Sequence, residues 1–120
     1  MSERLTLWGE MLARVLRTAK DEEGIQFPQM RQVVFESVCD VARDCPDALL
    51  DASGMARPLP PECPPDADWD AMMLPTSPYY DGAVEALAMF KIHAADALDV
   101  KQDSTARAWE QRYLRLTRGV

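Results

Sequence analysis

Hydrophobic residues recur every three or four positions in four stretches of the chain, which is the pattern of amphipathic helices. The first stretch, residues 3–23, carries an apolar stripe formed by Leu5, Trp8, Leu12, Val15, Leu16 and Ala19. A second stripe predicts a helix over residues 28–44, and Pro28 suits its first position, where a missing N–H costs nothing. Gly9 lowers the stability of the first predicted helix by about 1 kcal/mol relative to Ala.

The third stretch, residues 78–98, is apolar on almost every side. It contains six alanines between positions 83 and 97 and few charged residues, which is typical of a central helix packed on two sides. A short connection, residues 99–102, leads to the last predicted helix, residues 104–118. So short a connection predicts that these two helices form an antiparallel hairpin. The inward face of the last helix is predicted to hold Ala106, Trp109, Tyr113 and Leu116.

The connection between the second and third helices, residues 46–77, has a different composition. Seven of the nine prolines lie between Pro58 and Pro78, and residues 44–70 hold seven acids and one base. A pure linker would lack the apolar side chains found here, which include Trp69, Met72, Met73 and Leu74. We therefore expect an extended segment that either wraps the domain or docks on a partner. Residues 55–60 and 71–75 could pair as a short β-hairpin within it.

Together these elements predict an all-α fold with one domain over residues 1–120: a small bundle of about four helices with a long proline-rich connection. The length of 120 residues fits one domain with a modest core. No stretch approaches the roughly 20 apolar residues of a membrane span. We expect a protein without a membrane partner that is made in a cytoplasm.

The net charge of −7 is unevenly distributed along the chain. Residues 1–100 hold 8 basic and 18 acidic groups, a net −10, whereas residues 101–120 hold 5 basic and 2 acidic groups, a net +3. An acidic surface disfavours binding to a nucleic-acid duplex, which needs Lys and Arg to replace counterions. The asymmetry is either ordinary scatter on a solvated surface or the basis of a head-to-tail assembly.

Three arginines with a spacing of three, Arg112, Arg115 and Arg118, lie in the last helix near its C-terminal end. One interpretation is that they complement the helix dipole. The other is that they form a subunit contact. The predicted interface therefore consists of these three arginines together with the apolar residues of the connection: Trp69, Met72, Met73 and Leu74.

The candidates for chemistry are weak. Residues 66–70 resemble the start of a calcium loop, but Ala71 and Ser77 occupy the positions that need Gly and Glu. His93 shares a helix face with Asp96, yet no nucleophile on a strained turn accompanies them. Three cysteines without C-x-x-C spacing, Cys39, Cys45 and Cys63, are expected to be free thiols in a reducing cytosol. We predict no metal, no cofactor and no enzymatic activity.

The order of several short motifs resembles a known family. Phe27-Pro28 opens a helix that ends at Asp44-Cys45-Pro46-Asp47-Ala48-Leu49, and Leu74-Pro75 precedes Pro78-Tyr79-Tyr80-Asp81, which opens an alanine-rich helix. A helical hairpin with Asp96 and Asp99 follows, and the last helix carries Trp109 and Tyr113. This order resembles the small head–tail connector (adaptor) proteins of tailed bacteriophages. The proline-rich middle has no counterpart in that pattern.

The resemblance implies a virion protein made in the bacterial host, whose helical bundle assembles as a homo-oligomeric ring, most often a dodecamer. Such a ring would join portal protein to tail proteins around a DNA channel without reading DNA sequence. An acidic inner wall would repel DNA and let it slide.

The alternative is a small acidic interaction module in the cytoplasm. An inhibitor or immunity-type protein of this kind would present its carboxylates to a basic partner, and its binding would weaken steeply with salt.

Overall fold

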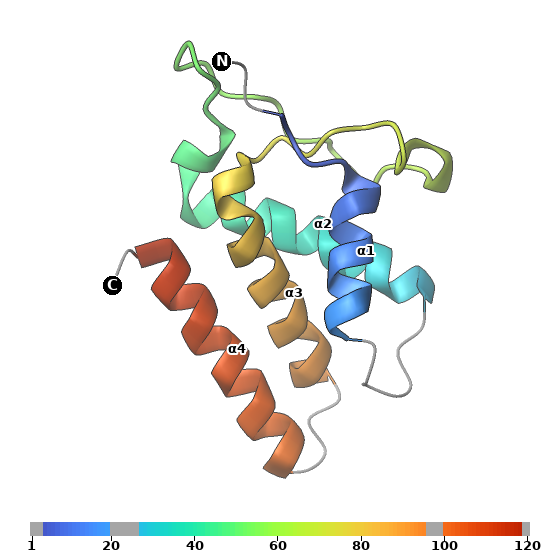
Figure 1. Cartoon of the computed structure of the whole chain (residues 1–120), viewed down its shortest axis with the longest axis vertical. Coiled ribbons are helices and arrows are strands. Elements are labelled where there is room, and N and C mark those ends of the chain that lie inside the picture. Colours follow the sequence, from blue (N-terminus) through green and yellow to red (C-terminus); the bar gives the residue numbers. More distant parts are fainter. Residues whose placement is uncertain (1–3, 20–26, 96–99, 119–120) are drawn as a thin grey trace.

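The computed structural model describes residues 4–19, 27–95 and 100–118, and within these ranges the chain forms four α-helices (Figure 1). Three single turns of 3₁₀-helix, η1 (Pro46–Leu49), η2 (Asp66–Asp68) and η3 (Pro78–Tyr80), lie between the second and third α-helices. The α-helices are α1 (Trp8–Thr18), α2 (Phe27–Asp44), α3 (Asp81–Ala95) and α4 (Val100–Arg118). The predicted all-α bundle is confirmed. None of the helices in the described ranges is long and apolar enough to cross a membrane.

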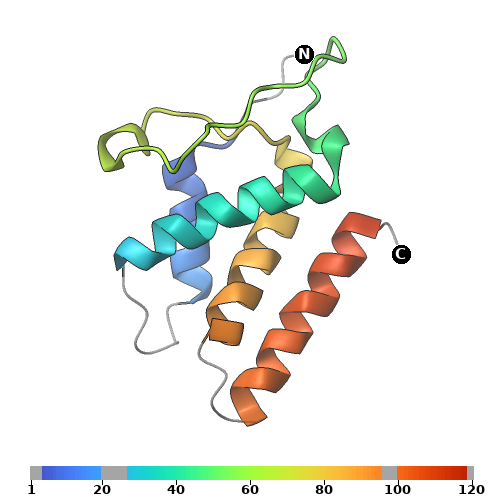
Figure 2. The ribbon, with the colours of Figure 1, turned by 180° about the vertical axis from the view of Figure 1, so that it is seen from behind.

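Helix α3 is the centre of the bundle. It contacts α1, α2 and α4, and every residue from Ala83 to Met89 is buried. This burial confirms that the apolar stretch is covered on more than one side, as expected of a helix with almost no polar face. Helix α4 lies beside α3 in the antiparallel direction in both views, as the predicted hairpin requires (Figures 1 and 2).

The core is built around two tryptophans. Trp8 and Trp69 meet edge to face with their ring centroids 5.4 Å apart, and Phe35 of α2 lies 6.1 Å from Trp8. The apolar stripes of the first two helices close on them and on α3, burying Met11, Leu12 and Val15 of α1 and Met30, Val34, Val38 and Val41 of α2.

Helix α1 is shorter than the predicted 3–23 because the chain before it is extended. Leu7 and Met73 form an isolated antiparallel bridge, flanked by two backbone hydrogen bonds. The Leu74 N–H donates to the Thr6 carbonyl at 2.7 Å, and the Trp8 N–H donates to the Met72 carbonyl at 3.0 Å. Because Thr6 and Leu7 are extended in this pairing, they cannot belong to the helix, which begins at Trp8. Residues 20–23 lie outside the described ranges.

The connection after α2 wraps the domain. It forms two isolated bridges, Leu7–Met73 and Leu50–Ala56, and no strand among the described residues. The two stretches expected to pair as a β-hairpin, 55–60 and 71–75, each bridge to another part of the chain, so that hairpin is not confirmed. A tight turn follows Leu50, where Gly54 has a φ of 86°, in the left-handed region that favours glycine.

The last two helices also depart from the predicted bounds. The Ser77 hydroxyl accepts a hydrogen bond from the Tyr79 N–H at 3.3 Å and so caps η3, which leads directly into α3. Residues 96–98, the end of the predicted third helix, lie outside the described ranges. Helix α4 begins at Val100, four residues before the predicted start at 104.

Candidate interaction surfaces

The seven residues of the predicted interface lie in three different environments. Trp69 and Leu74 are in the core, 2% and 0% exposed. The Trp69 indole N–H donates to the Pro64 carbonyl at 2.8 Å, in a buried hydrogen bond within the connection. These two side chains hold the connection on the domain and are not accessible to a partner in this structure.

Met72 and Met73 line an apolar groove of about 590 Å³, formed with Leu5, Trp8, residues 57–61, Leu74 and Pro75. We call it the Pro–Met groove. The Met73 side chain is 56% exposed, although its neighbours on both sides in the chain are partly or fully buried. Exposed apolar surface in a concave site is typical of a binding surface.

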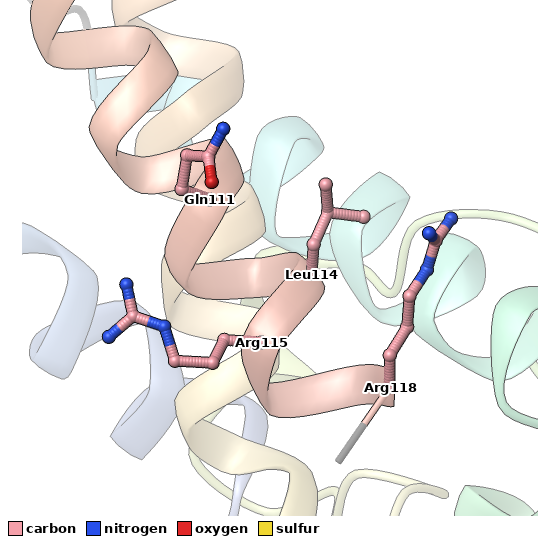
Figure 3. A pocket seen from close by; sticks show the side chains of 4 residues that line it. All are labelled: Gln111, Leu114, Arg115 and Arg118. Carbon is pink, nitrogen blue, oxygen red and sulfur yellow. The ribbon is translucent and has the colours of Figure 1, made fainter. Parts of the chain in front are cut away.

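The three predicted arginines form an exposed surface on α4, which we call the arginine face. The Arg112 guanidinium lies over the Trp109 ring, 5.6 Å from its centroid, in a cation–π contact. Arg115 and Arg118 extend to either side of Leu114 and, with Gln111, line a shallow hollow of about 330 Å³ (Figure 3). The structure therefore places two of the arginines around one hollow and the third on an aromatic ring.

A partly buried hydrogen bond anchors the arginine face to the rest of the bundle. The Tyr113 hydroxyl donates to Asp44 Oδ2 at 2.6 Å, across the junction between α4 and the end of α2. Burial of the phenol, followed by this hydrogen bond, raises the pKa of Tyr113 well above its ordinary value. The bond fixes the C-terminal half of α4, although Leu116, which was predicted to face inward, is 42% exposed.

Two buried carboxylates on α3 join it to the N-terminal part of the chain. Asp81 accepts a hydrogen bond from the Thr6 hydroxyl. Glu85, one turn later, accepts from the Thr18 hydroxyl at 2.8 Å and lies 3.3 Å from Arg14 of α1. The sequence signal for this pair is the i, i+4 spacing of two acids on an otherwise apolar helix, which places both on one face. Because their partners lie in α1 and in the extended segment before it, we assign them to the packing of this N-terminal part of the chain against α3.

The residues considered from the sequence as catalytic or metal-binding candidates do not form such a site in the described part of the chain. His93 is 2% exposed inside the bundle, and Asp96 lies outside the described ranges. No group of three His, Cys, Asp or Glu side chains among the described residues could hold a metal ion. The three cysteines are free and half-buried, and burial raises the pKa of each thiol, which lowers its reactivity.

An acidic turn around η2 lies on the opposite side of the molecule from the arginine face. Helix α4 runs along one side, and the turn that contains η2 projects from the other in both views (Figures 1 and 2). Around that turn Glu62, Asp66 and Asp70 are exposed, and Asp66 pairs with Arg31 of α2 at 3.4 Å. This turn therefore presents carboxylates on the side away from α4, although the exposed Asp44 at the end of α2 also lies beside Arg118.

Comparisons with protein-family models, with curated proteins and with solved structures found no match to this chain. The fold and surfaces define it as a small all-α protein with two unlike exposed surfaces.

Proposed function

We propose that this chain is a non-enzymatic structural protein of a phage virion, a head–tail connector that forms a ring between portal and tail. The observation that supports this most directly is the position of the arginine face and the acidic turn on opposite sides of the bundle. A ring is built from heterologous contacts, in which two different surfaces of one subunit meet their counterparts on the next. The order of motifs along the sequence supports the same proposal.

The packing of α4 suits such a contact. Helix α4 packs mainly on α3, so much of its surface is solvent-exposed, yet Tyr113 ties it to Asp44 of α2. A rigid, exposed and basic helix can dock on a neighbour's carboxylates with little loss of conformational entropy. We propose that the arginine face of one subunit contacts the turn around η2 of the next, that the ring leaves a channel for DNA, and that portal and tail proteins bind its two rims.

The state of assembly tests this proposal. Native mass spectrometry of the purified chain over a range of concentrations, with negative-stain images of the same samples, is expected to show closed rings, formed by the free protein or on a portal ring. A chain that stays monomeric and does not bind a portal ring contradicts the proposal. A stable monomer or dimer that binds a basic protein partner, with affinity falling steeply as salt rises, supports instead the acidic interaction module.

A further inference from the structure

An open backbone edge borders the Pro–Met groove at Met73. The hydrogen bonds that flank the Leu7–Met73 bridge are donated by Leu74 and Trp8, so Leu7 and Met73 are a non-hydrogen-bonded pair. In an antiparallel pair of this kind, the N–H and C=O of each residue point away from the partner segment. Within the described residues, neither group of Met73 has a hydrogen-bond partner. Such an edge is a template for another extended segment.

At Leu7, the other residue of the bridge, both backbone groups already have hydrogen-bond partners. The Leu7 N–H donates to Glu10 Oε1 at 2.9 Å, and its carbonyl accepts from the Met11 N–H at 3.1 Å. The bridge is therefore covered by α1 on one side and left unpaired on the other, which is the side of Met73. Any added segment would have to pair with Met73.

The walls of the groove favour an apolar, extended occupant. Pro58, Pro60 and Pro61 have no N–H, so this wall offers no backbone donors at three of its five positions. Trp8 also lines the groove, and its buried indole N–H has no acceptor within the described part of the chain. A peptide carbonyl is the natural acceptor for an indole N–H at an interface. These features together fit the addition of a strand, in which backbone bonds supply affinity and pockets receive alternate side chains.

Exposed acids near the groove favour an occupant that carries positive charge. Glu62 directly follows the proline wall and is exposed, and Asp70 is exposed two residues before Met72. Among the described residues, Arg57 is the one charged residue that lines the groove, and its guanidinium donates to the Pro75 carbonyl at 3.2 Å. The exposed carboxylates of Glu62 and Asp70, which are close in the chain to residues that line the groove, are complementary to a segment that carries Lys or Arg between its apolar residues.

We propose that the Pro–Met groove binds an extended segment of a partner protein in which apolar residues alternate with Lys or Arg, paired through the Met73 backbone. The inference does not depend on ring formation, because it uses the open edge at Met73 and not the arginine face. It assigns Met72 and Met73 to a peptide-binding site.

A designed hexapeptide, acetyl-Lys-Leu-Lys-Val-Lys-Leu-amide, serves as the probe in an NMR titration of the ¹⁵N-labelled full chain. We expect saturable shifts of the Met73 amide and the Trp8 indole N–H at peptide concentrations up to about 5 mM, the range expected of a short contact. The same peptide with Glu in place of Lys is expected to cause no such shifts, and added salt should weaken the binding.

Two exposed methionines of the connection provide a matched pair of variants. Met73→Lys places a positive charge at the edge and is expected to weaken binding of the lysine peptide about tenfold. Met55→Lys, at a residue 68% exposed and outside the groove, carries the same change and should bind as the wild type does.

Three results would overturn the proposal. The first is the absence of saturable shifts at Met73 and Trp8 with the lysine peptide. The second is equal weakening by Met73→Lys and Met55→Lys, which would make the binding a general charge effect. The third is concentration-dependent shifts of Met73 and Trp8 without peptide, which would assign the groove to a second copy of this chain.

Discussion

Tyr113 and Asp44 form the contact that fixes the exposed helix α4 to the end of α2. The Tyr113 side chain is 6% exposed, and its hydroxyl has a carboxylate acceptor at 2.6 Å. A phenol in this position resists ionisation, first because burial disfavours the phenolate and then because the phenolate would lose the hydrogen bond and face a negative charge. The residue therefore links the stability of the domain to pH.

We predict that the free energy of unfolding falls as pH rises above 10. In the unfolded chain Tyr113 ionises near its ordinary pKa of about 10, whereas in the folded state its pKa is raised, so the unfolded state binds fewer protons. The stabilisation is complete below pH 10 and is lost above it, by up to about 1.4 kcal/mol per pH unit.

Urea denaturation of the wild type and Tyr113→Phe measures this contribution directly. At pH 7 the variant should be less stable by about 1 kcal/mol because it lacks the hydrogen bond, and Tyr79→Phe, at an 81% exposed residue, should unfold as the wild type does. The difference between wild type and Tyr113→Phe is expected to narrow above pH 10, and a constant difference would refute the prediction. The raised thiol pKa values act equally in both proteins and cancel.

At the scale of the elements, Gly9 is the residue where helix propensity and tertiary packing give opposite predictions. From propensity alone, Gly9→Ala would stabilise α1 by about 1 kcal/mol. In the fold, a Cβ at this position would lie 2.6 Å from Asp70 Oδ1 and 2.9 Å from the Trp69 carbonyl oxygen. The same carbonyl accepts the Gly9 N–H at 2.7 Å. The glycine lets the backbone of the connection approach α1.

We predict that Gly9→Ala lowers the free energy of unfolding by about 1–2 kcal/mol, since the cost of overpacking exceeds the gain in propensity. Gly82→Ala is the matched control in α3. There the added Cβ would lie 3.6 Å from Leu116 Cδ1, an ordinary contact, so we expect stabilisation by about 0.4–1 kcal/mol. Urea denaturation of both variants checks the pair, and a stabilised Gly9→Ala would show that the connection does not press on α1.

The sequence predicts the features of this fold that depend on neighbouring residues, and it misses those that depend on contacts between segments far apart in the chain. The 3.6-residue periodicity located all four helices, because burial of one stripe is a local requirement. The same periodicity wrongly extends the first helix back to residue 3. Residues 6–8 pair instead with residues 72–74, and a local pattern cannot reveal a pairing between segments so far apart in the sequence. For the same reason Trp69 and Leu74 were predicted as interface residues, although they pack in the core. An apolar residue in a proline-rich segment does not reveal which surface covers it.

At the scale of the whole molecule, the fold places the arginine face of α4 on the side opposite the carboxylates around η2 (Figures 1 and 2). The separation of charge is not complete, because Asp44, an acid exposed at the end of α2, lies beside Arg118. Arg115 and Arg118 are also in the last turn of α4, where positive charge complements the helix dipole. The two interpretations of these arginines therefore predict different results when their charges are reversed. A subunit contact predicts loss of assembly, whereas a role in complementing the helix dipole predicts only a small loss of helix stability.

We predict that Arg115→Glu combined with Arg118→Glu blocks the formation of rings while circular dichroism shows an unchanged helix content. Arg112 is left intact because its guanidinium packs over Trp109. The control, Arg17→Glu with Arg43→Glu, reverses exposed arginines in the last turns of α1 and α2, so both double variants change the net charge by the same amount at helix C-termini. The control also breaks the exposed ion pair of Arg43 with Asp40 at 2.9 Å. Each reversal should cost about 0.3–1 kcal/mol of helix stability. If native mass spectrometry shows both double variants assembling alike, the arginine face only complements the dipole of α4. Loss of assembly in the α4 variant alone identifies that face as the subunit contact.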